Sequence, residues 1–276
     1  MSDPAARVDA GAVWGGATVP AEEGRDLTAI LQALVAGELA GAVVGGVEIR
    51  DLPDPRLARA ALAAAFVVQL EVRRSEVTDH ADVVLPVAPP VDKPGTYVNW
   101  EGRMRPFPQV RTSTAQSDRR VLNDLARDLG ADLRLAKLSD AIDQLREFDR
   151  WEGERAAFPG FAALKVPEVG GSEAVLATFR LMLDAARGQD GEPHLAGTAH
   201  RPVVRLSPAF AAQLGAAAGE RVTVTGPAGS VTLPLLPTAM PHHVVWLPQN
   251  SPGCSVYDQL GAGAGDIVSL TKEVAP

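Results

Sequence analysis

The stretch ADVVLPVAPPVDKPGTYVNWEGRMRPF, residues Ala81–Phe107, determines the fold class of this chain. It begins with a short apolar run, Val83–Leu85, that is typical of a buried strand. A proline-rich corner follows, and then a polar loop with four candidate binding residues, Thr96, Asn99, Glu101 and Arg103. Open α/β sheets bind ligands just beyond the carboxyl ends of their strands, so a ligand site is one of two equally supported interpretations of this loop. The alternative is a loop held together by hydrogen bonds among its own Asn, Glu and Arg side chains.

Helix and strand patterns alternate upstream of this stretch. Helices are predicted after Asp26 and after Asp54-Pro55, where an acidic cap precedes an apolar-periodic or Ala-rich run. Apolar strands are predicted at 42–47 and 66–72. Strands that are apolar on both faces and separated by helices indicate a parallel sheet covered by helices. Because an average sheet has ~5–6 strands, we expect this partial sheet to begin inside a larger α/β domain.

After Phe107 the predicted elements are first helices, then a linker, and then short strands. Three more helices are predicted, with caps at Ser117, Ser139 and Ser172. The polar, Gly-rich stretch 187–201 has no period and is typical of a linker. Short strands beyond it, including a hairpin around Gly226–Gly229, predict a small closed barrel.

These patterns predict the α/β fold class, with a partial parallel sheet and flanking helices followed by a small C-terminal β-barrel. The expected organisation has four parts. They are an extended N-terminal segment at 1–25, a partial α/β domain with a helical extension at 26–186, a linker at 187–201 and the barrel at 202–276.

Composition excludes several function classes. The chain has 26 Lys and Arg against 34 Asp and Glu, a net charge of −8, and no basic run offsets it locally. Such a surface repels nucleic acid and anionic lipid, so we expect no nucleic-acid partner. No apolar run approaches the ~18 residues that span a bilayer, which predicts no direct membrane insertion. The N-terminus lacks the basic and apolar regions of a secretory signal.

Cys254 limits the redox chemistry of the chain, because it is the only cysteine. An iron–sulfur cluster takes about four cysteine ligands, so we expect no cofactor in this chain itself. We expect Cys254 to be a small buried residue rather than a nucleophile, since no His is placed to activate it. The Gly-x-Ser-x-Gly elbow of hydrolases is absent, and no catalytic residue is predicted.

Three further motifs have structural interpretations. Asp79, His80 and Asp82 resemble metal ligands, but neighbouring side chains of a strand point to opposite faces, which favours a capped turn. The adjacent His242 and His243 would diverge on a strand for the same reason. The run Gly261–Gly265 lacks the Lys-Ser/Thr of a phosphate-binding loop, which favours turn glycines. No metal site is predicted.

The motifs carry a family resemblance. ADVVLP, followed by DKPGT at 92–96 and NWEGR at 99–103, resembles the signature stretch of the molybdopterin oxidoreductase superfamily. GRDLTAILQALVAGELAGAVVGGVEIRDLPDP and FVVQLEVRRSEVTDHADVVLP resemble, more narrowly, the G subunit of bacterial NADH-quinone oxidoreductase (respiratory complex I) of the actinobacterial kind. VVRLSPAFAAQLGAAAGERVTVTGPAGSVTLPLLP resembles the small barrel that helps hold the dinucleotide cofactor of molybdoenzymes. The family usually has Glu in place of Asp92 and often Gln in place of Arg105.

The resemblance implies that the chain is the C-terminal portion of that subunit and that the barrel is of the double-psi type. It implies a redox-inactive scaffold segment in the peripheral electron-transfer arm, cytoplasmic and held at the inner face of the plasma membrane by partner subunits. The partners would be the other subunits of the complex and the cluster-bearing part of the parent, whose iron–sulfur clusters lie in its N-terminal part. Thr96, Asn99, Glu101 and Arg103 would line at most a relic of a pterin pocket. No catalysis is expected from this chain alone.

Two other hypotheses stay open. The chain would be the C-terminal, cofactor-enclosing part of an active molybdenum or tungsten oxidoreductase such as a formate dehydrogenase, which would bring molybdopterin. Metal and pterin analysis of the full parent distinguishes this hypothesis from the scaffold. Alternatively, the chain would be a free-standing binding module, although an incomplete sheet leaves an unpaired edge that is prone to aggregation.

Overall fold

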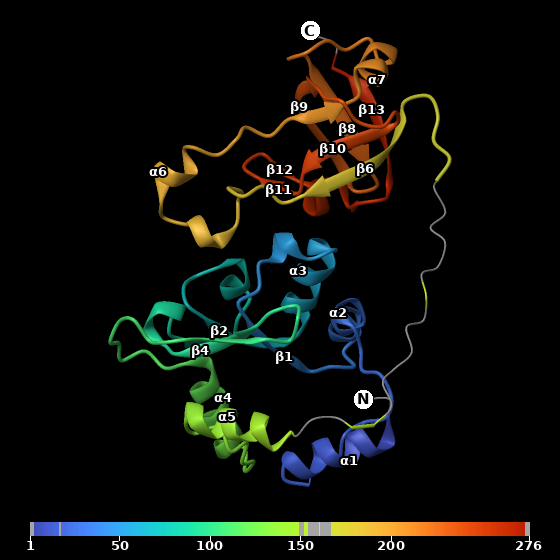
Figure 1. Cartoon of the computed structure of the whole chain (residues 1–276). Coiled ribbons are helices and arrows are strands. Elements are labelled where there is room, and N and C mark those ends of the chain that lie inside the picture. Colours follow the sequence, from blue (N-terminus) through green and yellow to red (C-terminus); the bar gives the residue numbers. More distant parts are fainter. Residues whose placement is uncertain (1–2, 17, 149–151, 154–159, 161–166, 274–276) are drawn as a thin grey trace. The chain divides into compact units, whose positions relative to one another are not determined.

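A computed structural model describes residues 3–16, 18–148, 152–153, 160 and 167–273 (Figure 1). The chain forms two compact units. The first comprises Met1–Val47 and Ala64–Gly160, and the second comprises Glu48–Ala63 and Phe161–Pro276. The second unit therefore includes a segment, residues 48–63, that lies in the sequence between two strands of the first unit.

The first unit contains a parallel sheet of three strands, in the order β1 (Gly41–Gly45), β2 (Phe66–Glu71) and β3 (Val83–Pro86). Val68 of the central strand pairs with Val43 on one side and with Val83 on the other. A carboxylate oxygen of Asp82 accepts a hydrogen bond of 2.8 Å from the backbone N–H of Val67, which fixes the approach to β3. The predicted partial parallel sheet is confirmed.

Both outer strands of this sheet are open. β1 and β3 pair with no further strand in the part of the chain that the structure describes. Val43, Val83 and Val84 on these strands are exposed. Parallel sheets are normally covered on both faces. In the first unit, the described residues leave these apolar side chains of the sheet uncovered.

Helix α1 (Pro4–Val13) corrects the expectation of an extended segment at 1–25. The Asp3 carboxylate accepts hydrogen bonds from the backbone N–H groups of Ala5 and Ala6 at 2.7 and 3.0 Å, and Pro4 occupies the first turn. An acidic cap followed by a first-turn proline is a helix start signal. The Ala- and Gly-rich composition concealed it.

The other helices of the first unit begin at or near the predicted caps. Asp26 caps α2 (Leu27–Val35) and Ser117 caps α4 (Asp118–Asp128), both through the side chain. Helix α5 (Leu138–Glu147) begins before the expected Ser139, because the Asp140 carboxylate accepts a 2.7 Å hydrogen bond from the Lys137 N–H. The short 3-10 helices η2 (Glu76–Asp79) and η3 (Pro90–Asp92) and the hairpin of β4 (Gly95–Val98) and β5 (Met104–Phe107) complete this unit.

The second unit is built on a closed six-stranded barrel, in the order β10-β6-β13-β8-β9-β7. Its strands are β6 (Glu173–Phe179), β7 (Val204–Leu206), β8 (Arg221–Gly226), β9 (Gly229–Pro237), β10 (Val244–Pro248) and β13 (Ile267–Lys272). Helix α7 (Pro208–Gln213) begins after the Ser207 cap and places Phe210 in the buried core. The fold prediction, a partial α/β part with a small barrel, is confirmed, as is the β8–β9 hairpin.

Strand β6 corrects the helix predicted after Ser172. Figure 1 shows β6, in yellow, among the orange and red strands of the barrel. It pairs in parallel with β10 and antiparallel with β13. Ala174 and Leu176 are buried with the period of a strand, and β-branched Val175 and Thr178 suit that conformation. Pairing on both sides therefore overrides the apolar spacing that looked helical.

The expected boundaries at 26–186, 187–201 and 202–276 differ from the observed units. Because β6 closes the barrel, the stretch 187–201 lies within the second unit, between β6 and β7. It contains the short helices η4 (Arg187–Gln189) and α6 (Pro193–Ala196). The second unit also includes η1 (Ile49–Asp51) and nearly all of α3 (Pro55–Ala64), which the sequence assigned to the α/β part.

The remaining elements of the barrel unit are small. A two-stranded ribbon, β11 (Asn250–Ser251) and β12 (Cys254–Ser255), leads into the π-helix η5 (Val256–Leu260). Leu260 is fully buried, and Gly261 follows it in the left-handed conformation at φ 61°. Glycine adopts this conformation at no steric cost, so the predicted turn glycines end the π-helix.

Candidate functional site

The β4–β5 hairpin carries the four predicted binding residues. Thr96 lies in β4, Asn99 and Glu101 lie in the turn, and Arg103 directly precedes β5. The base of the hairpin is fixed by Asp92, whose two carboxylate oxygens accept hydrogen bonds from Arg111 at 2.7 and 3.0 Å. These hydrogen bonds hold the pKa of the Asp92 carboxyl below its ordinary value.

The turn brings Asn99, Glu101 and Arg103 together. The side-chain oxygen of Asn99 accepts hydrogen bonds from the backbone N–H groups of Glu101 and Arg103 at 3.1 and 2.8 Å. Glu101 accepts a 3.3 Å hydrogen bond from the Asn99 amide and pairs with Arg103 at 3.3 Å. Gly102 completes the turn at φ 78°. This pattern favours the interpretation that the loop is stabilised by its own polar side chains.

Thr96 lies apart from these three residues. It lines a pocket of about 400 Å³ together with Lys93, Tyr97, Phe107, Asp118 and Arg119. Lys93 is ion-paired with Asp118, and the rings of Tyr97 and Phe107 stack with centroids 5.0 Å apart. A Cβ on Gly95 would collide with the Phe107 ring, so the glycine permits this packing.

Both charged and apolar side chains line this pocket, and the rings of Tyr97 and Phe107 form an aromatic wall. Its lysine is neutralised by Asp118, and the Arg119 guanidinium donates to the backbone oxygen of Leu135. Asn99, Glu101 and Arg103 are not among the residues that line it. These three residues lie outside this pocket, and the relic pterin site stays a prediction.

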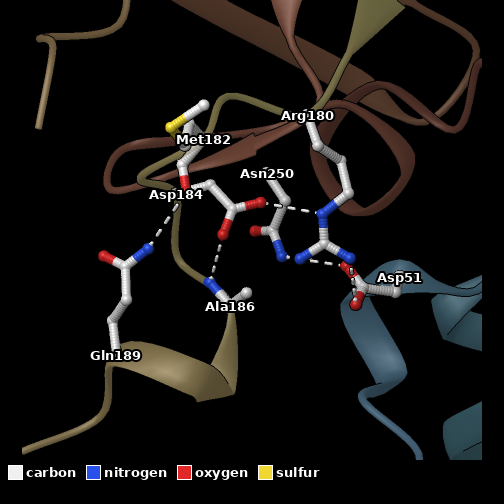
Figure 2. Close-up of polar contacts among 7 residues, drawn as sticks. All are labelled: Asp51, Arg180, Met182, Asp184, Ala186, Gln189 and Asn250. Atoms are coloured by element: carbon white, nitrogen blue, oxygen red, sulfur yellow. Dashed lines mark hydrogen bonds and ion pairs between the residues drawn. The ribbon is translucent and has the colours of Figure 1, made fainter.

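A second polar site ties the segment 48–63 to the barrel (Figure 2). Arg180, just after β6, donates hydrogen bonds of 2.8 Å to Asp184 and of 2.8 Å to Asp51. The Asn250 amide donates to the other oxygen of Asp51 at 3.1 Å. The Asp184 side chain is only 4% exposed, and its second oxygen accepts a 2.8 Å hydrogen bond from the Ala186 N–H.

Arg180 is the centre of this network. The hydrogen bond to Asp184 and the negative charges of Asp51 and Asp184 raise the pKa of its guanidinium. Two further contacts join the same parts of the second unit. Arg59 pairs with Asp258 at 2.6 Å, and Arg56 donates to the Ala228 carbonyl at 2.8 Å. Sequence reasoning missed these residues, because partners separated by more than a hundred positions leave no local pattern.

Cys254 is buried in the barrel core. Its thiol donates to the Pro248 carbonyl at 3.3 Å, and burial raises the pKa of the thiol to about 12. The thiolate, which is the nucleophilic and metal-binding form, is therefore scarce at neutral pH. The prediction of a small buried residue is confirmed.

The other metal-ligand candidates have separate partners. Asp79 pairs with Arg74 at 2.7 Å, and Asp82 bonds the Val67 backbone. The described residues contain no group of three or more His, Cys, Asp or Glu side chains able to hold a metal. The prediction that His242 and His243 diverge is wrong, since their ring centroids lie 4.5 Å apart. His243 precedes β10 with φ 53°, outside the strand conformation, which brings the rings together.

The described part of the barrel contains buried polar atoms without a hydrogen-bond partner. They include the side-chain oxygens of Asn250, Ser251 and Ser255 on the β11–β12 ribbon. All three residues are buried. No helix in the described part of the chain has the length and hydropathy needed to cross a membrane.

Comparisons with known proteins identify relatives. Residues 178–275 match the family described as "Molydopterin dinucleotide binding domain". The chain is 49% identical over 275 residues to the G subunit of NADH-quinone oxidoreductase from Mycobacterium bovis, covering 98% of this chain and 34% of the relative. It is 46% identical over 276 residues to the same subunit of Streptomyces coelicolor, covering 98% of this chain and 33% of the relative. The chain thus spans about one third of the length of these relatives.

A solved structure shares the fold. Acetylene hydratase from Pelobacter acetylenicus matches 87% of this chain and 42% of its own, with a TM-score of 0.50 and 17% identity. At this identity the likeness concerns the fold alone. The similarity over nearly the whole chain shows that this chain is homologous to a segment of the actinobacterial G subunits of NADH-quinone oxidoreductase, and the matching domain fits the molybdopterin oxidoreductase superfamily.

Proposed function

We propose that this chain is a redox-inactive scaffold segment of NADH-quinone oxidoreductase, in the peripheral electron-transfer arm of the complex. The observation that carries the proposal is the 49% identity to the G subunit across 98% of the chain. Its contribution would be to shape and hold neighbouring protein rather than to transfer electrons. The polar ties of Arg180 and Arg59 within the second unit support such a structural role.

The position of Cys254 supports the absence of a redox centre from this chain. A cluster needs about four thiolates, whereas the sequence has one cysteine and its thiol is buried and protonated. The iron–sulfur clusters of the parent subunit would therefore be ligated elsewhere. The partners would be the cluster-bearing part of the parent and other subunits of the complex, on the cytoplasmic side of the plasma membrane.

One observation favours a second candidate function. The match of residues 178–275 to a dinucleotide-binding domain also fits the cofactor-enclosing part of an active molybdenum or tungsten oxidoreductase, such as a formate dehydrogenase. If that cofactor bound, it would supply the redox chemistry. The self-bonded turn at Asn99 weighs against this candidate.

The experiment that tests the proposal is affinity purification of the tagged protein from its native membranes, followed by mass spectrometry and metal analysis. Untagged membranes taken through the same procedure are the control. We expect recovery of NADH-quinone oxidoreductase subunits with iron and without molybdenum. Recovery of molybdenum and pterin in the absence of those subunits would refute the scaffold proposal and support the second candidate.

A further inference from the structure

We propose that the β4–β5 hairpin, residues 95–107, is a docking arm that inserts into a cleft of a partner protein. The cleft has apolar walls and a carboxylate that faces Arg105. This inference rests on the proposed function, because a scaffold segment in a complex has protein neighbours, and it assigns the contact to one named element.

The docking arm exposes large apolar side chains. Trp100 is 93% exposed, Tyr97 64% and Val98 63%. Met104 in β5 is also exposed. Aromatic side chains each bury roughly 150–250 Å² when covered, so these four residues offer several hundred Å² of apolar surface. Aromatic residues and Met are enriched in protein–protein interfaces relative to the rest of the surface.

The exposed residues lie on both faces of the ribbon. Val98 is the cross-strand partner of Met104, so these two side chains share one face. Tyr97 is the partner of Arg105 and shares the opposite face with it. Trp100 stands in the turn between them. A flat partner surface would cover one face alone, whereas a cleft covers both faces and the tip.

The docking arm is built to be rigid before it binds. A two-stranded hairpin is marginally stable by itself in water. Here the Asn99 side chain fixes the tip through two backbone hydrogen bonds, and the Asp92–Arg111 pair fixes the base. The stacked rings of Tyr97 and Phe107 brace one face. An arm that is already ordered loses less conformational entropy when it docks.

Charge decides the class of partner. Arg103 pairs with Glu101 and Arg111 pairs with Asp92, whereas Arg105 forms no ion pair with any residue that the structure describes. Trp, Tyr and Arg are the residues that dominate protein–protein contacts. A net charge of −8 for the chain disfavours anionic lipid as the alternative. The arm therefore fits a protein cleft that carries a carboxylate opposite Arg105.

The test compares tagged variants by the amount of NADH-quinone oxidoreductase subunits that each recovers from native membranes. We expect Trp100→Ala and Arg105→Glu each to lower recovery by about tenfold or more, as loss of a contact hot spot does. Met182→Ala is the matched control, since Met182 is 97% exposed and lies outside the arm. Thermal denaturation checks folding, and the almost fully exposed Trp100 predicts an unchanged Tm for its variant.

The outcomes separate the two proposals. Equal recovery by the wild type, Trp100→Ala and Arg105→Glu would overturn the docking arm and leave the scaffold proposal standing. Failure of the wild type to recover the complex would overturn the scaffold proposal and, with it, this inference. A photo-crosslinking amino acid at position 100 identifies the occupant. A crosslink to another polypeptide of the complex supports the proposal, and a crosslink to lipid or to a second copy of this chain contradicts it.

Discussion

The barrel buries its inward apolar side chains, whereas the three-stranded sheet leaves several of its apolar side chains exposed. The six barrel strands close on each other, and their inward side chains form one buried core around Phe210, Leu247 and Leu270. The sheet has two outer strands with no described partner, and apolar side chains on it and on the β4–β5 hairpin are exposed. A closed barrel removes strand edges, whereas an open sheet invites further pairing.

This contrast shows which unit pairs its own strands and buries its own core. The second unit satisfies its own strands and core, including the extra segment 48–63 that Asp51 and Arg59 tie to it. The first unit leaves apolar side chains of its sheet and hairpin exposed. In a scaffold segment we expect the barrel unit to provide stability and the sheet and hairpin to provide contacts.

The largest difference in the free energy of unfolding should appear when a phenylalanine is truncated to alanine in each of the two regions. Phe210→Ala in the barrel core, where the side chain is 0% exposed, should lower the free energy of unfolding by about 3–5 kcal/mol because it leaves a cavity. Phe66→Ala on β2, where the side chain is 54% exposed, should cost below about 1 kcal/mol. Chemical denaturation followed by circular dichroism measures both. Equal losses would remove the distinction between the two regions.

The Arg180 network should give the next strongest effect. Arg180→Met leaves the enclosed Asp184 carboxylate without its ion-pair partner, and we expect a loss of about 2 kcal/mol, reduced because Arg180 itself is partly exposed. Arg221→Met removes an exposed pair with Glu273 and should cost at most about 1 kcal/mol. The same denaturation measurement compares them. A greater loss in the control would show that Arg180 is not a structural centre.

The Arg59–Asp258 pair predicts a weaker effect that depends on pH. The Arg59 hydrogen bond and charge lower the pKa of Asp258 in the folded chain. The pair therefore stabilises the fold above the unfolded carboxyl pKa of ~3.9, and this stability is lost as pH falls through the lower folded pKa.

Stability of the wild type and of Asp258→Asn, measured from pH 7 down to pH 3, tests this prediction. The difference should be constant at neutral pH, at most about 1 kcal/mol for a partly exposed pair, and should shrink in the acidic range. Asp79→Asn, at an exposed pair in the first unit, is the matched control. A difference for Asp258→Asn that does not change with pH would contradict the assignment.

The last prediction concerns reactivity rather than stability. Cys254 should resist alkylation in the folded protein at pH 7–8, because its thiol is buried with a pKa of about 12. A cysteine placed on the open edge by Val84→Cys, in a Cys254→Ala background, should react readily because Val84 is exposed. Mass spectrometry after a short pulse of iodoacetamide compares the two. Rapid labelling of Cys254 would show that the barrel opens.

Much of the fold could be predicted from local signals, but not evenly. Asp54-Pro55 correctly predicted the start of α3, where the Asp54 carboxylate accepts a 2.9 Å hydrogen bond from Leu57. Asp3-Pro4 is the same signal and was missed. Strand β6 was misassigned because its conformation depends on β10 and β13, which lie about 70 and 90 residues away.

The candidate site shows the same limit. The hydrogen-bonded turn of Asn99, Glu101 and Arg103 is local, and the sequence indicated it as the alternative to a binding loop. The Asp51–Arg180 and Arg59–Asp258 pairs join residues 129 and 199 positions apart. Only the folded arrangement brings them together. The same holds for the assignment of 48–63 to the barrel unit.

Hydrogen–deuterium exchange is the decisive measurement of this division between a self-sufficient barrel and a contact-forming sheet. The protein is measured alone and within the complex recovered from native membranes. We predict that backbone amides of β6–β10 and β13 are equally protected in both states, while those of β1, β3 and residues 95–107 gain protection in the complex. Unchanged exchange in the sheet and hairpin, with new protection confined to the barrel, would contradict this division.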